Sequence, residues 1–126
     1  MASELPLDCI HIRDLTLRCI VGIFPEERNE KQDVIINITL HADLSAACLS
    51  DRIEDTIDYK ALKKRVVAMI ENSSFFLIER LAQAVADLCL EEPRVQRVSV
   101  SVDKPGALRF ARSVAVEIFR ERNDNA

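Results

Sequence analysis

The sequence predicts an α+β fold, in which one four-stranded antiparallel sheet carries two helices on one face in the order ββααββ. Four segments alternate between apolar and polar residues, which is the period of a half-buried strand. Two central segments repeat apolar residues every three to four positions, which is the period of an amphipathic helix. Because the helical segments lie between two pairs of strands, we expect two hairpins covered by the helices.

The bulk composition is typical of one domain that buries a core. The chain has 126 residues, of which 48% are hydrophobic and 30% charged. We expect a single domain over 1–126, with flexible tails at 1–8 and 121–126. The net charge of −4 argues against general binding of the nucleic-acid backbone. No apolar run reaches transmembrane length. With no C-x-x-C pair among four cysteines, we expect reduced thiols in a soluble, cytoplasmic protein that binds no membrane.

The first two strands form the first expected hairpin. Cys9 to Val21 alternates, but its apolar phase shifts near Arg13 and Asp14, which predicts a strand with a bulge. The segment 22–25 breaks the pattern. Asp33 to Leu44 then alternates without interruption and predicts the second strand.

Two helices follow this hairpin. Asp58 is placed to cap the first helix. Its inward face is expected to hold Leu62, Val66, Met69 and Ile70. The second helix is expected from Phe76 to Leu90 and ends before Pro93. Its inward residues are expected to be Leu77, Ile78, Leu81, Val85, Leu88 and Cys89.

The last hairpin is expected from Val95 to Val102 and from Ser113 to Arg120, joined by the turn DKPGALRFAR. A four-stranded sheet has two free edges, which proteins protect or use for pairing. The outer strands are long, rich in β-branched residues and free of proline. We therefore expect the edges to pair with other copies of the chain in a homo-oligomer.

Four polar residues stand where the pattern of the fold does not require them: Glu27, Tyr59, Glu79 and Lys104. Taken one at a time, each has a structural explanation, as a solvated charge, an edge-protecting lysine or a tyrosine that packs its ring. Glu79 follows an apolar run, so we expect one side of it to be dry and to need a hydrogen-bond donor; a solvated helix face is the alternative. A desolvated lysine, in turn, can act as a base.

Taken together, these residues resemble the dihydroneopterin aldolase/epimerase family over roughly Ile10 to Arg120. The resemblance is carried in order by GIFPEERNEKQ with Glu27, DTIDY with Tyr59, FFLIERLAQAVA with Glu79, and DKPGALR with Lys104. It implies a fold of the tunnelling type. It also implies that subunits close their sheets into a multi-chain β-barrel in two stacked four-subunit rings, with sites between neighbouring subunits.

The resemblance implies a role for each of these residues. Glu79, with main-chain groups near Ile78, binds the amino and amide edge of a pterin, because a carboxylate accepts two parallel hydrogen bonds from such an edge. Tyr59 lies near the ring and its side chain, Glu27 helps to hold the ligand, and Lys104 is the general acid/base. No metal, cofactor or Schiff base is implied, since the C=N bond of a dihydropterin is itself the electron sink.

Within the family, the sequence resembles most the branch that epimerises 7,8-dihydroneopterin triphosphate at C2′. Arg109 and Arg112 follow Lys104 closely and predict a cationic patch for the triphosphate, with solvation or pairing to surface carboxylates as the alternative. The KPGA element is shared with aldolases. An aldolase that releases glycolaldehyde and 6-hydroxymethyl-7,8-dihydropterin is therefore the main alternative, and a non-catalytic oligomer that binds pterins or purines is a further one.

Overall fold

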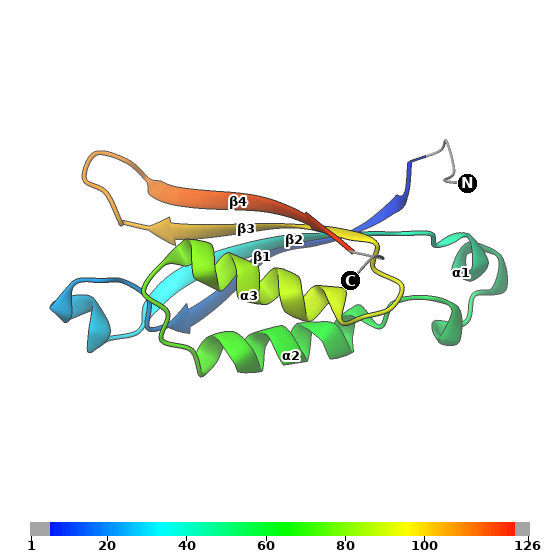
Figure 1. The fold of residues 1–126 in the computed structure, drawn as a ribbon, viewed down its shortest axis with the longest axis horizontal. Helices are drawn as coiled ribbons and strands as arrows, with labels where there is room; N and C mark the ends of the chain where they lie inside the picture. The colour runs from blue at the N-terminus through cyan, green and yellow to red at the C-terminus, as the bar shows by residue number, and fades with distance from the viewer. Residues whose placement is uncertain (1–5, 123–126) are drawn as a thin grey trace.

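A computed structural model describes residues 6–122 and contains the predicted sheet (Figure 1). Within these residues four antiparallel strands lie in the order β1-β2-β3-β4, and helices α2 and α3 cover one face. The strands are β1 (Asp8–Cys19), β2 (Gln32–Ala42), β3 (Arg97–Pro105) and β4 (Ser113–Glu121). The helices are α2 (Tyr59–Glu71) and α3 (Ile78–Leu90). The predicted ββααββ order is confirmed.

The predicted bulge in the first strand is also confirmed. The register between β1 and β2 shifts between Ile12 and Leu15, where β1 holds one residue more than its partner strand. Asp14 adopts a positive φ of 55° inside this bulge, and its amide donates to the Asn37 side-chain oxygen at 2.9 Å. The extra residue moves the apolar side chains on both sides of it to the same face of the sheet.

Helix α2 begins as the sequence predicts. The Asp58 carboxylate accepts a hydrogen bond from the Ala61 amide at 3.0 Å and so caps the helix. Leu62, Val66 and Ile70 are buried against the sheet, while Met69 is half-buried.

Helix α3 begins at Ile78, two residues later than predicted. Leu77 is extended, with φ −123° and ψ 140°, and is 50% exposed, so its predicted inward position is wrong. A helix that began at Phe76 would use the Phe75 carbonyl, which follows that of Ser74, as its first acceptor. Instead they accept hydrogen bonds from the loop that follows β1. Tertiary contacts therefore fix the start of this helix.

Three short elements were not predicted. They are the 3-10 helices η1 (Pro25–Arg28) and η2 (Ile53–Asp55) and the six-residue helix α1 (Ser45–Ser50). The second strand consequently ends at Ala42 and not at Leu44. The short elements carry no buried residue, which explains why no apolar period marks them.

The core lies between the sheet and the two long helices. On the sheet side it holds Val34, Ile36, Ile38 and Leu40 of β2 and Val98, Val100 and Val102 of β3. On the helix side it holds Leu81, Ala82, Val85, Ala86 and Cys89 of α3. None of the helices within residues 6–122 is both long and apolar enough to cross a membrane.

Each predicted tail gives a residue to a strand, because β1 starts at Asp8 and β4 ends at Glu121. Arg122 also donates to the carbonyls of Leu90, Glu92 and Val95. The outer parts of both predicted tails, 1–5 and 123–126, lie outside the described residues.

Candidate active site

One end of the molecule gathers the loop after β1, the start of α3 and the β3–β4 turn, and α1 lies at the opposite end (Figure 1). At the gathered end is an open cleft of about 330 Å³. The loop forms one wall with Gly22, Phe24 and Glu27. The other wall is formed by Phe76, which precedes α3, and by Ile78 and Glu79 in its first turn. Lys104 of β3 and Val114 and Val116 of β4 also line the cleft.

A salt bridge between Lys104 and Glu27 lies in this cleft. The Lys104 Nζ is 2.5 Å from Glu27 Oε2, and the two side chains are 12% and 19% exposed. The hydrogen bond from Lys104 is the main reason that the pKa of Glu27 lies below its ordinary value, although burial acts in the opposite direction. Glu27 is thus an ion-paired carboxylate and not one more solvated charge.

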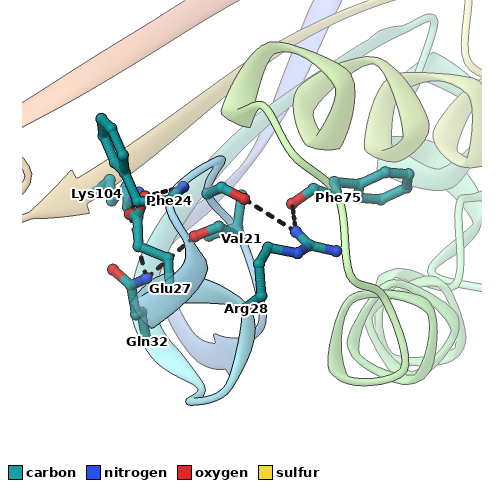
Figure 2. A network of polar contacts seen from close by, with 8 residues as sticks. Val21, Phe24, Glu27, Arg28, Gln32, Phe75 and Lys104 are labelled. Atoms are coloured by element: carbon teal, nitrogen blue, oxygen red, sulfur yellow. Dashed lines mark hydrogen bonds and ion pairs between the residues drawn. The ribbon is translucent and has the colours of Figure 1, made fainter.

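Further contacts fix the Glu27 side chain in the loop (Figure 2). Its Oε1 accepts from the Phe24 amide at 3.2 Å, and its Oε2 accepts from the Gln32 side chain at 3.4 Å. Gly22 makes room for this carboxylate, since a Cβ added at Gly22 would lie 2.3 Å from Glu27 Cδ. Gly22 also has a φ of +141°, which L side chains rarely adopt.

Glu79 and Ile78 occupy the opposite wall, in the first turn of α3. Glu79 is exposed and Ile78 is half-buried, so the dry side predicted for Glu79 is absent in the single chain. The helix has no side-chain cap, and its first bond runs from the Leu81 amide to the Leu77 carbonyl. A carboxylate acceptor and the uncapped amides at the positive end of a helix therefore meet at the cleft.

Tyr59, Arg109 and Arg112 lie outside the cleft. Tyr59 is the first residue of α2, far along that helix from the end that leads into α3, and it is 58% exposed. Both arginines are exposed in the β3–β4 turn, which borders the cleft at Ala107. The Arg109 guanidinium lies 5.4 Å from the Phe110 ring, and the Arg112 carbonyl accepts from the Gly106 amide.

Arg28 does not line the cleft but contacts both of its walls, and it was not singled out from the sequence. It donates to the carbonyls of Gly22 at 3.0 Å, Phe75 at 3.0 Å and Ser74 at 2.6 Å. Its guanidinium also lies over the Phe76 ring at 4.1 Å. In the sequence it stands among charged loop residues, and no local pattern distinguishes it from them.

A larger hollow, of about 550 Å³, is lined by residues that include His41, Arg97 and Phe119 and contains none of the predicted site residues. Within residues 6–122, no three His, Cys, Asp or Glu side chains gather as a metal site would require. We take the smaller cleft as the candidate site because it alone of the two contains the shielded salt bridge.

The salt bridge predicts a stability that depends on pH. The folded-state pKa of Glu27 lies below its ordinary value of 4.5, so the stability from its charged form is present above about pH 4.5 and is lost as the pH falls through the folded-state pKa. We expect Glu27→Gln to lower the free energy of unfolding by roughly 1.5 kcal/mol at neutral pH.

The difference between the Glu27→Gln variant and wild type should shrink toward zero in acid, as measured by urea unfolding at several pH values. Glu26→Gln, at an exposed position in the same loop, is the control and should change the free energy of unfolding by less than about 0.5 kcal/mol. A difference for Glu27→Gln that stays constant as the pH falls would contradict the ion-pair account.

Comparison with known proteins assigns the family. The model of the family described as dihydroneopterin aldolase matches residues 10–119. The chain belongs to this family. A dihydroneopterin triphosphate 2′-epimerase of Pseudomonas aeruginosa is 40% identical over 113 residues, covering 90% of this chain and 92% of that protein. The epimerase of the same name from Escherichia coli is 38% identical over 117 residues, covering 93% and 98%.

Members named as aldolases are also similar to the chain. A dihydroneopterin aldolase of Streptomyces coelicolor is 35% identical over 101 residues, covering 80% of this chain and 85% of that protein. Among solved structures, a putative dihydroneopterin aldolase of Vibrio cholerae superposes with a TM-score of 0.90 at 32% identity, over 94% of this chain and all of that one. The E. coli dihydroneopterin aldolase in complex with neopterin gives 0.86 at 31% identity, over 90% and 99%. The predicted family and α+β fold are confirmed.

Proposed function

We propose that this family member epimerises 7,8-dihydroneopterin triphosphate at C2′, with Lys104 as the general acid/base. The observation that carries the proposal is the shielded Lys104–Glu27 pair, in the same cleft as Glu79 and the uncapped start of α3. The cleft thus contains a proton carrier together with an acceptor and donors for a pterin edge. The identities of 38–40% to epimerases, against 35% to an aldolase, support the choice of reaction.

The wall formed by α3 is the proposed binding site for the ring. The Glu79 carboxylate accepts from the amino and ring N–H groups of the pterin, and the uncapped amides near Ile78 donate to its carbonyl oxygen. The side chains of Phe24 and Phe76, which are 58% and 60% exposed in the single chain, supply apolar surface beside the ring.

The proposed reaction breaks and re-forms one carbon–carbon bond. Lys104 first gives its ammonium proton to N5 of the ring and then, as an amine, accepts the proton of the 2′-hydroxyl. The C1′–C2′ bond breaks, and C2′ becomes an aldehyde carbon. The electron pair moves into a C1′=C6 bond while N5 holds the proton from Lys104, so the dihydropterin ring is the electron sink. Re-addition of C1′ to the other face of the aldehyde inverts C2′, takes the hydroxyl proton back from Lys104 and returns the N5 proton to Lys104.

The aldolase reaction is the second candidate. It shares the bond-breaking step but releases the aldehyde, and C1′ is then protonated to give 6-hydroxymethyl-7,8-dihydropterin. The KPGA element that begins at Lys104 is shared with aldolases in the family resemblance, and it favours this candidate together with the relatives named aldolase.

Product analysis separates the two reactions. The protein is incubated separately with dihydroneopterin and with its triphosphate, and the pterins are resolved by chromatography. We expect inverted triphosphate without hydroxymethyl-dihydropterin. Rapid glycolaldehyde release from dihydroneopterin without inversion of the triphosphate would contradict the epimerase proposal and support the aldolase reaction.

We further propose that the active protein is a homo-oligomer with sites between neighbouring copies. Strands β1 and β4 are the outer strands of the sheet within residues 6–122, so each leaves an edge for pairing. Tyr59 does not line the cleft of its own chain. In the proposed assembly, Tyr59 of a neighbouring copy completes the site and covers Glu79.

The arginines of the β3–β4 turn are proposed to bind the triphosphate. If they do, Arg109→Ala and Arg112→Ala should each raise the KM for the triphosphate about tenfold, the size of one charge-assisted hydrogen bond, and leave the KM for dihydroneopterin unchanged. Arg52→Ala, which removes an exposed arginine paired with Glu54, is the control. An unchanged KM for the triphosphate in both variants would show that neither arginine binds the triphosphate.

A further inference from the structure

We infer that Arg28 is a positioning residue that fixes the two walls of the cleft relative to each other. The inference rests on the proposed function for its kinetic consequence but not for its structural one. Arg28 ends the short 3-10 helix η1, one residue after Glu27, and its side chain points away from the Lys104–Glu27 pair toward Phe75 (Figure 2).

The contacts of Arg28 join two segments that are far apart in the sequence. One nitrogen donates both to the Gly22 carbonyl and to the Phe75 carbonyl, each at 3.0 Å. The other donates to the Ser74 carbonyl at 2.6 Å. Gly22 lies in the wall that carries Glu27, whereas Ser74 and Phe75 lead directly into the wall that carries Glu79.

The geometry requires a guanidinium group. A planar group with several donors reaches three carbonyls on two segments at once, while its face rests on the Phe76 ring at 4.1 Å. A lysine offers a single nitrogen and cannot reproduce both the spread of donors and the stacking. Within residues 6–122 Arg28 forms no salt bridge, so backbone carbonyls and one aromatic ring are the partners of its charge.

Loss of Arg28 leaves little to hold the walls together at this point. Apart from the Arg28 contacts, the Gly22 amide donates to the Phe75 carbonyl at 3.2 Å. A pterin ring bound to Glu79 on one wall would then no longer be held at a fixed distance from Lys104 beside the other. Proton transfer is sensitive to such a shift, since about 1 Å of misplacement lowers a rate by about 10²-fold.

The kinetic test uses Arg28→Ala and Arg28→Lys, with Arg52→Ala as the matched control on the far side of the molecule. We expect kcat to fall about 10²-fold in both Arg28 variants, because lysine cannot replace the clamp. The KM should change less than about threefold, since the ring-binding wall itself is intact. Arg52→Ala should leave both constants unchanged. Full activity in Arg28→Lys, or a loss confined to KM, would overturn the inference.

A double-mutant cycle with Lys104→Ala separates positioning from a general loss of folded protein. If Arg28 acts by placing the substrate against Lys104, Arg28→Ala should lower the residual rate of the Lys104→Ala protein by less than about threefold. An equal loss in both backgrounds would show that Arg28 acts independently of Lys104 and would overturn the positioning role.

Hydrogen exchange tests the clamp without any substrate. We expect Arg28→Ala to speed amide exchange at least about tenfold at Gly22, whose amide bonds the Phe75 carbonyl, and at Leu81, whose amide makes the first bond of α3. Exchange in the buried strand β2 should stay unchanged. Unchanged exchange at both amides would overturn the clamp. If wild-type protein converted neither pterin substrate, the proposed function would fail, and the clamp would then be decided by hydrogen exchange alone.

Discussion

Replacing Lys104 with alanine is expected to lower kcat for epimerisation by about 10²–10⁴-fold, the range that a general acid/base contributes. The Lys104 amine is the one cation that lines the cleft among residues 6–122, and its 2.5 Å contact to Glu27 fixes its position. The KM should change little, because Glu79 and the start of α3, on the other wall, hold the ring. Steady-state kinetics with dihydroneopterin triphosphate measure both constants.

Two further variants make the Lys104 result specific. Lys104→Gln keeps a neutral hydrogen-bond donor near Glu27 but no amine, and we expect a loss of kcat similar to that of alanine. Lys63→Ala removes an exposed lysine from α2 and should leave the rate unchanged. Full activity in Lys104→Ala would show that another residue is the general acid/base. A wild-type protein without activity would favour the non-catalytic alternative.

Replacing Gly22 with alanine is expected to remove most activity and to lower the free energy of unfolding by about 2–5 kcal/mol. Two effects add at this position. The backbone has a φ of +141°, and the new Cβ would fall 2.3–2.5 Å from the carboxylate carbon and oxygens of Glu27. The carboxylate must therefore move, and it takes the hydrogen bond to Lys104 with it.

Gly106→Ala is the matched control for Gly22→Ala. Gly106 also has a positive φ, of +72°, but a Cβ there meets nothing within 4 Å. Its substitution should therefore lower the free energy of unfolding by only about 1–2 kcal/mol, the value of the backbone strain alone. Urea unfolding compares the two variants, and equal losses would contradict a role for Gly22 in seating Glu27.

Features that depend on neighbouring residues and on local periodicity could be predicted from the sequence. The alternation of β2, the phase change at the β1 bulge and the Asp58 cap each depend on neighbouring residues and appear as predicted. The start of α3 does not appear as predicted. The Ser74 and Phe75 carbonyls before it accept hydrogen bonds from Arg28, which is 46 and 47 positions away in the sequence. The same tertiary contacts explain why Leu77 is exposed.

The site shows the same division between local and distant information. Glu27 and Lys104 are 77 positions apart, and only the family resemblance placed them together before the structure did. The clamp of Arg28 could not be predicted, since an arginine between glutamates in a loop looks like any solvated charge. Tyr59 was expected near the ring, but it is the first residue of α2 and does not line the cleft of its own chain.

The central claim is that C2′ inverts by cleavage and re-formation of the C1′–C2′ bond. Epimerisation of dihydroneopterin triphosphate in D₂O, with the product examined by NMR and mass spectrometry, tests it most directly. The C2′–H bond is never broken in this reaction, because that hydrogen stays on the aldehyde carbon. We therefore expect inverted product without deuterium at C2′. One deuterium at C2′ in the inverted product would show direct proton abstraction from carbon and would contradict the proposed mechanism.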